Sequence, residues 1–241
     1  MNRVCLVTGA GRRVGRSIAL AMARAGHDIV VHHRNSKTDA DEVAAECRDI
    51  GVAAEPMQAD LTSSSEIGEL FAALDARFGR LDVLVNSAAT FLRTPPDTLS
   101  EADFDLLMGV NLKAPYLCSI EAVRLMRRGK AGRIVNIADV AAERPMRNYV
   151  PYCVSKAGLL MLTRTMARAF APQIQVNAVS PGTVLFRSDE TAEMRTKVVS
   201  RIPKGRVGTP EDVASAVVYL CTGSDYVTGT VIHVDGGRSL S

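Results

Sequence analysis

Short apolar runs alternate with helical patterns along the whole chain, and this alternation most constrains the fold. The runs are rich in Val and Ile and nearly continuous, as expected for parallel strands buried on both faces. We expect strands at Arg3–Thr8, Asp28–His33, Ala53–Gln58, Asp82–Asn86, Gly132–Ala138, Ile174–Ser180 and Val231–Asp235. Helical patterns lie near 14–25, 38–50, 64–78, 101–128, 151–171 and 211–221. Together they predict an α/β fold with a seven-stranded, doubly wound parallel sheet flanked by helices.

The length and the charge of the chain indicate how many domains it has and which partners it lacks. No repeat or linker interrupts the 241 residues, so we expect a single domain over 1–241, with a polar, weakly patterned substrate flap at 182–203. The net charge of +3 is spread along the chain without blocks of like charge, which argues against a nucleic-acid partner.

The spacing of the cysteines and the N-terminal residues indicate the cellular compartment of the protein. The five cysteines are far apart and form no Cys-x-x-Cys pair, so neither a disulfide framework nor a metal site is expected. The apolar run that ends at Thr8 is too short for a signal peptide or a membrane span. We therefore expect a cytoplasmic protein with no membrane partner.

A glycine-rich turn follows the first expected strand, in the sequence Thr8-Gly9-Ala10-Gly11-Arg12-Arg13-Val14-Gly15. Such a turn lets the backbone approach a pyrophosphate, and the following helix supplies amide donors. The alternative is a tight turn that only closes a strand–helix unit. Because both the strand and the helix are present, we favour a Rossmann-type dinucleotide site, with Gly9, Arg12, Arg13 and Val14 at the phosphates.

The end of the second expected strand indicates which dinucleotide binds. An NAD site needs an acid there for the ribose hydroxyl, whereas this chain has His33-Arg34-Asn35-Ser36. Arg34 can bind a 2′-phosphate through two hydrogen bonds, with His33 and Ser36 as further donors. A solvated basic loop is the alternative, but the position favours NADPH. Four further residues are expected along the adenosine: Asp60, Leu61, Asn86 and Ser87.

Tyr152 and Lys156 stand four residues apart, which on a helix places both side chains on one face. An ammonium beside a phenol lowers the pKa of the phenol and makes it a usable proton donor. Asp139 lies thirteen residues before Tyr152. An ionised Asp would repel an oxyanion, whereas a protonated Asp could supply a proton to a ring nitrogen.

Five motifs in this order resemble the short-chain dehydrogenase/reductase family: the glycine-rich turn, Asn86-Ser87-Ala88-Ala89, Asn111, Tyr152-x-x-x-Lys156 and Ser180-Pro181-Gly182. The resemblance covers essentially the whole chain. It implies that Tyr152 donates the proton and that Lys156 binds the nicotinamide ribose and lowers the tyrosine pKa. It also implies that Asn111 holds a water in the proton relay and that Ala88, Pro181 and Gly182 line the cofactor.

Three departures from the family pattern resemble its pteridine reductase branch, which includes short-chain dihydromonapterin and dihydrofolate reductases. Arg13 replaces the second fingerprint glycine, and Asp139 replaces the catalytic serine. The usual Asn-Asn-Ala-Gly is Asn86-Ser87-Ala88-Ala89 here, followed by Thr90 and Phe91. A dihydropterin offers a C=N bond, so Asp139 could relay a proton to its nitrogen. Phe91 could stack on the pterin, and Arg13 could bridge the phosphates and the pterin edge.

Simpler explanations exist for each of these residues. Asp139 could be a loop carboxylate in an inactive homologue, Phe91 a core aromatic, and Arg13 a surface cap over the cofactor. Met146, Leu185 and Phe186 are candidates for the substrate pocket, but they could equally fill a gap in the flap.

The favoured function is NADPH-dependent reduction of a dihydropterin or dihydrofolate to its tetrahydro form. The first rival is a carbonyl reductase of the 3-oxoacyl or hydroxysteroid type, and the second is a non-catalytic NADP-binding sensor or scaffold. The resemblance also implies a homotetramer.

Overall fold

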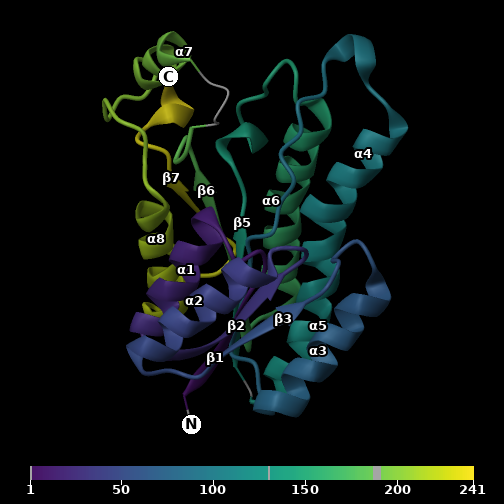
Figure 1. Cartoon of the computed structure of the whole chain (residues 1–241). Helices are drawn as coiled ribbons and strands as arrows, with labels where there is room; N and C mark the ends of the chain where they lie inside the picture. Colours follow the sequence, from purple (N-terminus) through teal and green to yellow (C-terminus); the bar gives the residue numbers. More distant parts are fainter. Residues whose placement is uncertain (1, 130, 187–190) are drawn as a thin grey trace.

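The computed structural model describes residues 2–129, 131–186 and 191–241. Within these residues seven parallel strands form one sheet in the order β3-β2-β1-β4-β5-β6-β7 (Figure 1). The strands are β1 (Arg3–Val7), β2 (His27–His33), β3 (Ala54–Gln58), β4 (Val83–Asn86), β5 (Gly132–Ile137), β6 (Ile174–Pro181) and β7 (Val231–Val234). This confirms the predicted seven-stranded, doubly wound α/β fold.

Helices cover both faces of the sheet (Figure 1). The α1 helix (Arg13–Arg24) packs against α2 (Lys37–Ile50) and α8 (Pro210–Thr222), while α3 (Ser64–Phe78) packs against α5 (Ala114–Arg128). The long α6 helix (Val150–Phe170) contacts β6 and α4 (Glu101–Met108). None of the described helices is long and apolar enough to cross a membrane.

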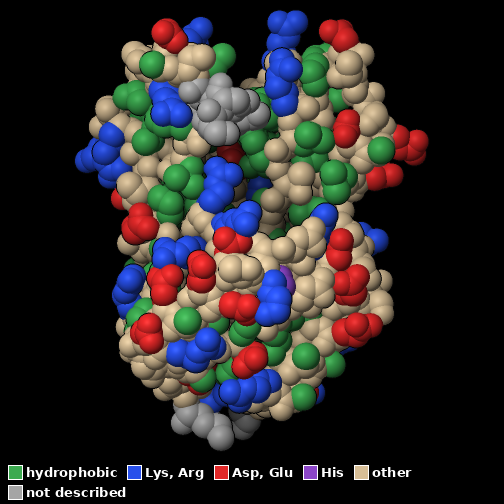
Figure 2. Space-filling model, in the orientation of Figure 1, with side chains coloured by type: hydrophobic (Ala, Val, Ile, Leu, Met, Phe, Trp, Pro, Cys, Tyr) green, Lys and Arg blue, Asp and Glu red, His purple; other side chains and the backbone are tan. Residues whose placement is uncertain are grey.

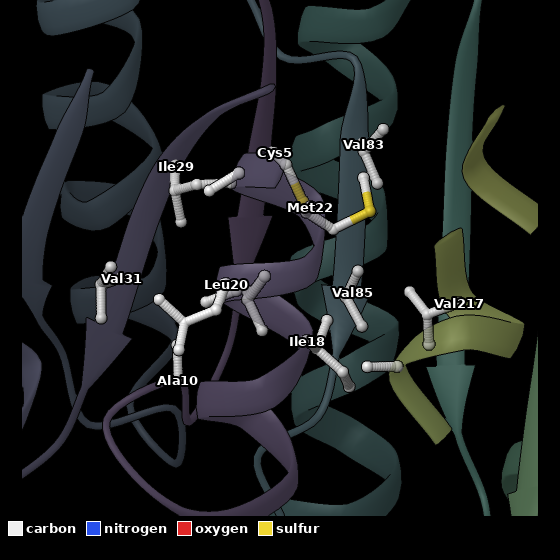
Figure 3. Close-up of a cluster of buried hydrophobic side chains, with 14 of the residues drawn as sticks. Cys5, Ala10, Ile18, Leu20, Met22, Ile29, Val31, Val83, Val85 and Val217 are labelled. Carbon is white, nitrogen blue, oxygen red and sulfur yellow. The ribbon is translucent and has the colours of Figure 1, made fainter. Parts of the chain in front are cut away.

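Alternation along the strands creates two separate cores, because successive side chains of a strand point to opposite faces. Cys5, Ile29 and Val83 pack under α1 and α8, as Figure 3 shows for this cluster. Val4, Val30 and Leu84 pack on the other face against α3 and α5. All five cysteines are unpaired and buried.

The expected helix over 101–128 is wrong as one continuous helix. The structure has α4, then a π-helical turn at Gly109–Lys113, then α5. Pro115 has no backbone N–H to donate to residue 111, so the α-helical ladder is interrupted there. The wider turn buries Asn111 against the loop after β4.

Short elements surround the carboxyl end of the sheet, and no hydrophobic period predicted them. They are the 3₁₀ turns η1 (Pro96–Thr98), η3 (Val140–Ala142) and η4 (Arg238–Leu240), and the α7 helix (Ala192–Val199). The α7 helix lies within the expected flap, of which residues 187–190 are outside the described residues.

Candidate active site

A cleft of about 950 Å³ opens at the carboxyl ends of the strands. Its walls come from the turn after β1, the loops after β4, β5 and β6, the N-terminal part of α6, and η4. The strand order reverses between β1 and β4, and ligands of open α/β sheets bind at such a switch point. Figure 2 shows a hollow on this face with Lys and Arg side chains around it.

Most of the predicted site residues meet in this cleft. The cleft wall includes Gly9, Arg12, Arg13, Val14, Arg34, Asp60, Leu61, Ser87, Ala88, Phe91, Asp139, Met146, Tyr152, Lys156, Pro181, Gly182 and Leu185. His33 and Asn35 lie beside it, in a smaller pocket of about 390 Å³ that shares Arg34 with the cleft.

Four predicted residues line neither pocket, which corrects the sequence analysis: Asn86, Ser36 and Phe186, and also Asn111, which is described below. Asn86 is buried below the cleft, where its Nδ2 donates to Asn136 Oδ1 at 2.8 Å. Ser36 precedes α2, and its hydroxyl faces Gly11 so closely that a Cβ on that glycine would lie 2.9 Å from it. Phe186 does not line the cleft, and its ring lies under the guanidinium of Arg195 at 5.1 Å.

The centre of the site is a hydrogen bond between the two groups that the sequence singled out. The Tyr152 hydroxyl donates to Asp139 Oδ2 at 2.8 Å. The other carboxyl oxygen, Oδ1, accepts from the Ala141 backbone N–H at 2.8 Å, which fixes the carboxyl group over the start of η3. The phenol therefore has a carboxyl partner where the family pattern has a serine hydroxyl.

Burial sets the protonation of this pair. Desolvation raises the pKa of Asp139, although hydrogen bonds from Ala141 and Tyr152 oppose the shift. Desolvation, and then the Asp139 charge, raise the pKa of Tyr152 well above its usual range. The phenol is therefore protonated at neutral pH and suits the role of a proton donor.

The expectation that the Lys156 ammonium lowers the pKa of Tyr152 is wrong in this structure. The Lys156 Nζ donates to the Ile137 carbonyl at 2.8 Å and lies 5.8 Å from the centre of the Tyr152 ring. Burial lowers the pKa of Lys156 to about 8, opposed by Asp139. The Asp139 carboxylate therefore affects the pKa of the phenol more strongly than this ammonium does.

Asn111 holds the loop after β4 in place. Its Oδ1 accepts from the Thr90 N–H at 2.8 Å, and its Nδ2 donates to the Thr90 carbonyl at 2.9 Å and to Ser155 Oγ at 3.2 Å. Thr90 and its neighbour Phe91 both line the cleft. The structure thus gives Asn111 a positioning role, and its expected role in holding a water stays a prediction.

Phe91 is 45% exposed and belongs to an aromatic group rather than to the main core. One face of its ring stacks on Tyr149 at 4.6 Å with an interplanar angle of 13°, and Tyr152 meets it edge-on at 4.7 Å. The stack supports one side of the Phe91 ring and holds it beside the Tyr152 ring.

The phosphate end fits an anionic dinucleotide. The α1 helix begins with no side-chain cap and no acid in its first turn, so its first amides have no side-chain acceptor. His33 lines the pocket with Arg34, and its buried Nδ1 atom has no hydrogen-bond partner among the described residues. Arg12 is already paired with Asp39 at 2.6 Å, so Arg13 is the better placed of the two for a phosphate.

His32, for which no role was predicted, builds the turn. The Gly9 N–H donates to His32 Nδ1 at 3.0 Å, and Nε2 lies 3.1 Å from the Ala59 carbonyl. Burial lowers the pKa of His32 to about 4, so the ring is neutral and binds both loops at once. No periodic pattern could have indicated this contact.

Comparison with known proteins agrees with this geometry. The family model described as Enoyl-(Acyl carrier protein) reductase matches residues 9–239. The chain belongs to the short-chain dehydrogenase/reductase family. It is therefore an oxidoreductase by family, with the Rossmann-like sheet of that family.

Relatives of known structure or name cover nearly the whole chain. A 3-oxoacyl-[acyl-carrier-protein] reductase of Staphylococcus epidermidis is 34% identical over 100% of both chains. One from Synechocystis is 36% identical over 99% of this chain and 97% of its own. The crystal structure of acetoin dehydrogenase from Enterobacter cloacae superposes with a TM-score of 0.92 at 34% identity, covering 100% of this chain and 96% of that one. None of these three is a pteridine reductase, so the comparisons support the family but not the expected branch.

Proposed function

We propose that this protein is an NADPH-dependent reductase that converts a dihydropterin or dihydrofolate to its tetrahydro form. The observation that carries the proposal is the 2.8 Å hydrogen bond from the Tyr152 hydroxyl to the Asp139 carboxyl group inside the cleft. A carbonyl substrate needs donors around an oxygen that becomes negative. An ionised carboxylate at that position disfavours such a charge, whereas a protonated carboxyl group can supply a proton to a ring nitrogen.

NADPH would supply the hydride when bound, and the chain supplies the proton. The carbon of the C=N bond gains the hydride, and its nitrogen gains a proton from the Tyr152 hydroxyl. Asp139, whose pKa is raised by burial, can return a proton to the tyrosine oxygen through the hydrogen bond between them. Lys156 would bind the nicotinamide ribose from its buried position beneath the phenol. Phe91 would support the flat pterin ring beside Tyr152.

The preference for NADPH rests on the end of β2. Arg34 and His33 line a pocket there, with Lys37 beside them and no acid at the position that would bind a ribose hydroxyl. Asp41 also lines this pocket, but it is paired with Lys37 at 2.7 Å. A basic pocket of this kind suits the 2′-phosphate.

A second candidate is a carbonyl reductase of the 3-oxoacyl or hydroxysteroid type. The names of the relatives favour it over the pterin candidate, because two are 3-oxoacyl reductases and one is an acetoin dehydrogenase. Asp139 in place of the serine is the observation against it. A non-catalytic NADP sensor or scaffold is the third candidate, and the intact Tyr152, Lys156 and Asn111 argue against it.

A substrate panel separates the three candidates. Oxidation of NADPH is followed with dihydrofolate, dihydrobiopterin, acetoacetyl-CoA and diacetyl, with and without the pterin analogue methotrexate, and NADH serves as the cofactor control. We expect turnover of a dihydropterin substrate, inhibition by methotrexate and a preference for NADPH. Rapid carbonyl turnover without pterin activity would establish the second candidate, and no turnover would favour the third.

Arg13 provides a test of the phosphate site through two opposite effects. Its φ of 53° lies in the left-handed region, which costs a non-glycine residue roughly 1–2 kcal/mol. Arg13→Gly should therefore stabilise the ligand-free protein by about 0.5–1 kcal/mol, because the flexibility of glycine offsets part of the relief. The same change should weaken NADPH binding by about tenfold or more, since a hydrogen bond to a charged group is worth about 1.5–3 kcal/mol.

Thermal unfolding and fluorescence titration with NADPH measure the two effects of Arg13→Gly. Arg12→Gly is the matched control, because Arg12 has an extended φ of −143° and should gain no stability. A stabilised Arg13→Gly variant with unchanged NADPH affinity would remove Arg13 from the proposed site.

The cytoplasmic location and the homotetramer stay predictions.

A further inference from the structure

Three arginines that the mechanism does not use line the cleft together with Tyr152. They are Arg144 after η3, Arg201 after α7 and Arg238 in η4. Figure 2 shows Lys and Arg side chains around the hollow on this face. Three segments far apart in the sequence thus bring like charges to one wall.

Two of these arginines donate to backbone carbonyl groups, and none of the three pairs with an acid among the described residues. Arg144 Nη1 donates to the Arg238 carbonyl at 2.5 Å, and Arg238 Nη1 donates to the Arg201 carbonyl at 3.4 Å. The hydroxyl of Ser241 also donates to the Arg201 carbonyl, at 2.7 Å. Burial lowers the pKa of Arg238, and the charges of Arg144 and Arg201 lower it further, so the three guanidinium groups repel one another.

The nearby acids do not neutralise this charge. Glu143 pairs with His233 at 2.5 Å, and the Asp235 carboxylate accepts from the N–H groups of Gly237 and Ser239. Neither acid lines the cleft. Among the described residues the acids on the cleft wall are Asp60 and Asp139 alone, and none of the three arginines forms an ion pair. A partly buried cluster of like charges favours an anionic ligand.

The phosphates of the cofactor would lie elsewhere. The expected phosphate groups are at α1 and at Arg34 after β2, whereas Arg238 follows β7. Strands β2 and β7 are five strand spacings apart in the sheet, roughly 24 Å at about 4.8 Å per strand. The arginine cluster therefore lies away from the positions expected for the cofactor phosphates, on the wall of the same cleft as Tyr152.

We propose that Arg144, Arg201 and Arg238 bind an anionic tail of the substrate, remote from the bond that is reduced. Resting on the proposed function, this selects dihydrofolate, with its two tail carboxylates, over dihydropterins with neutral side chains. The same chemistry would select a phosphate-bearing thioester if the reduced bond were a carbonyl. The charge on the substrate tail and the kind of bond that is reduced, C=N or C=O, can be tested separately.

The test uses two pairs of substrates that differ in tail charge: dihydrofolate with dihydrobiopterin, and acetoacetyl-CoA with diacetyl. We expect the anionic member of the active pair to have the higher kcat/KM. The side chain of Arg201 is exposed, and its guanidinium makes no hydrogen bond or ion pair to any described residue. Arg201→Gln should therefore leave the fold intact, and it should lower kcat/KM for the anionic substrate about tenfold, mainly through KM.

The controls separate charge from structure. Arg201→Lys keeps the charge and should retain most of the activity, and Arg147→Gln removes an exposed arginine outside the cleft and should have no effect. The neutral substrate should be insensitive to all three changes. Equal loss on both members of a pair, or no loss on the anionic one, would overturn the inference.

The same substrate pairs give a different pattern of activities if the proposed function is wrong. If the carbonyl pair is reduced and the pterin pair is not, the pterin assignment is wrong, and the tail site is judged from acetoacetyl-CoA against diacetyl. If neither pair is reduced, calorimetric titration of the NADPH-loaded protein with folic acid and with coenzyme A decides. Binding of either compound that is weaker in Arg201→Gln than in the wild type supports the tail site. No binding of either compound, or equal binding to both proteins, contradicts the tail site.

Discussion

Tyr152→Phe is expected to lower turnover by about 10²–10⁴-fold, the range that a positioned general acid contributes. The change removes only the hydroxyl that donates to Asp139 at 2.8 Å and leaves the ring edge-on to Phe91 at 4.7 Å. The aromatic packing, the cleft and the phosphate end therefore stay as they are. Steady-state kinetics on the substrate found in the panel measure the loss.

NADPH binding provides the control for this variant. Its Kd, measured by fluorescence titration, should change less than about threefold, because the proposed phosphate contacts lie at the far end of the cleft. The buried Asp139 carboxyl would lose its phenol partner, and burial would then raise its pKa further. A variant that binds NADPH normally and still turns over at the wild-type rate would exclude Tyr152 as the proton donor.

The sequence predicted the regular parts of the fold because their signals are local. Buried strands appear as apolar runs, and the two cores follow from alternation along strands such as Val4–Val7. The break between α4 and α5 was missed, because a helical period continues across Gly109–Lys113 and a single proline suffices to interrupt the ladder. The α7 helix was missed because it has no residue buried in the core.

The site was predicted where a motif fixes both residue type and position. Tyr152, Lys156 and Asp139 came together as expected, since Asp139 follows β5 while Tyr152 and Lys156 lie in the first turns of α6. Asn86 was placed wrongly, because a polar residue at a strand end can face the interior amide of Asn136 as well as the cleft. Arg201 and Arg238 were given no role, since they meet only through the tertiary fold.

The effect of burial on the pKa of Tyr152 could not be predicted from the sequence. The spacing of Tyr152 and Lys156 indicated a lowered phenol pKa, yet burial and the Asp139 carboxylate raise it. The ammonium is held by the Ile137 carbonyl instead. Which neighbour dominates depends on distances of a few ångströms that only the folded chain defines.

Asp139→Ser should change which bond the enzyme reduces. A serine hydroxyl can donate a hydrogen bond to a carbonyl oxygen, but it cannot hold an extra proton for a ring nitrogen. We expect pterin reduction to fall by about 10²-fold or more, since a proton relay contributes on that scale, with diacetyl or acetoacetyl-CoA reduction appearing or rising. The panel of four substrates measures both changes in one experiment.

The pH dependence separates a chemical role of Asp139 from a structural one. Burial raises the pKa of this carboxyl group, so its protonated form extends above pH 3.8 and is lost as the pH rises through the raised pKa. Wild-type kcat should therefore fall with rising pH, and Asp139→Asn, which keeps the shape, should be slow and lack that limb. If Asp139→Ser keeps the wild-type substrate profile and Asp139→Asn keeps the wild-type pH profile, Asp139 has no part in proton transfer and the carbonyl candidate becomes the better one.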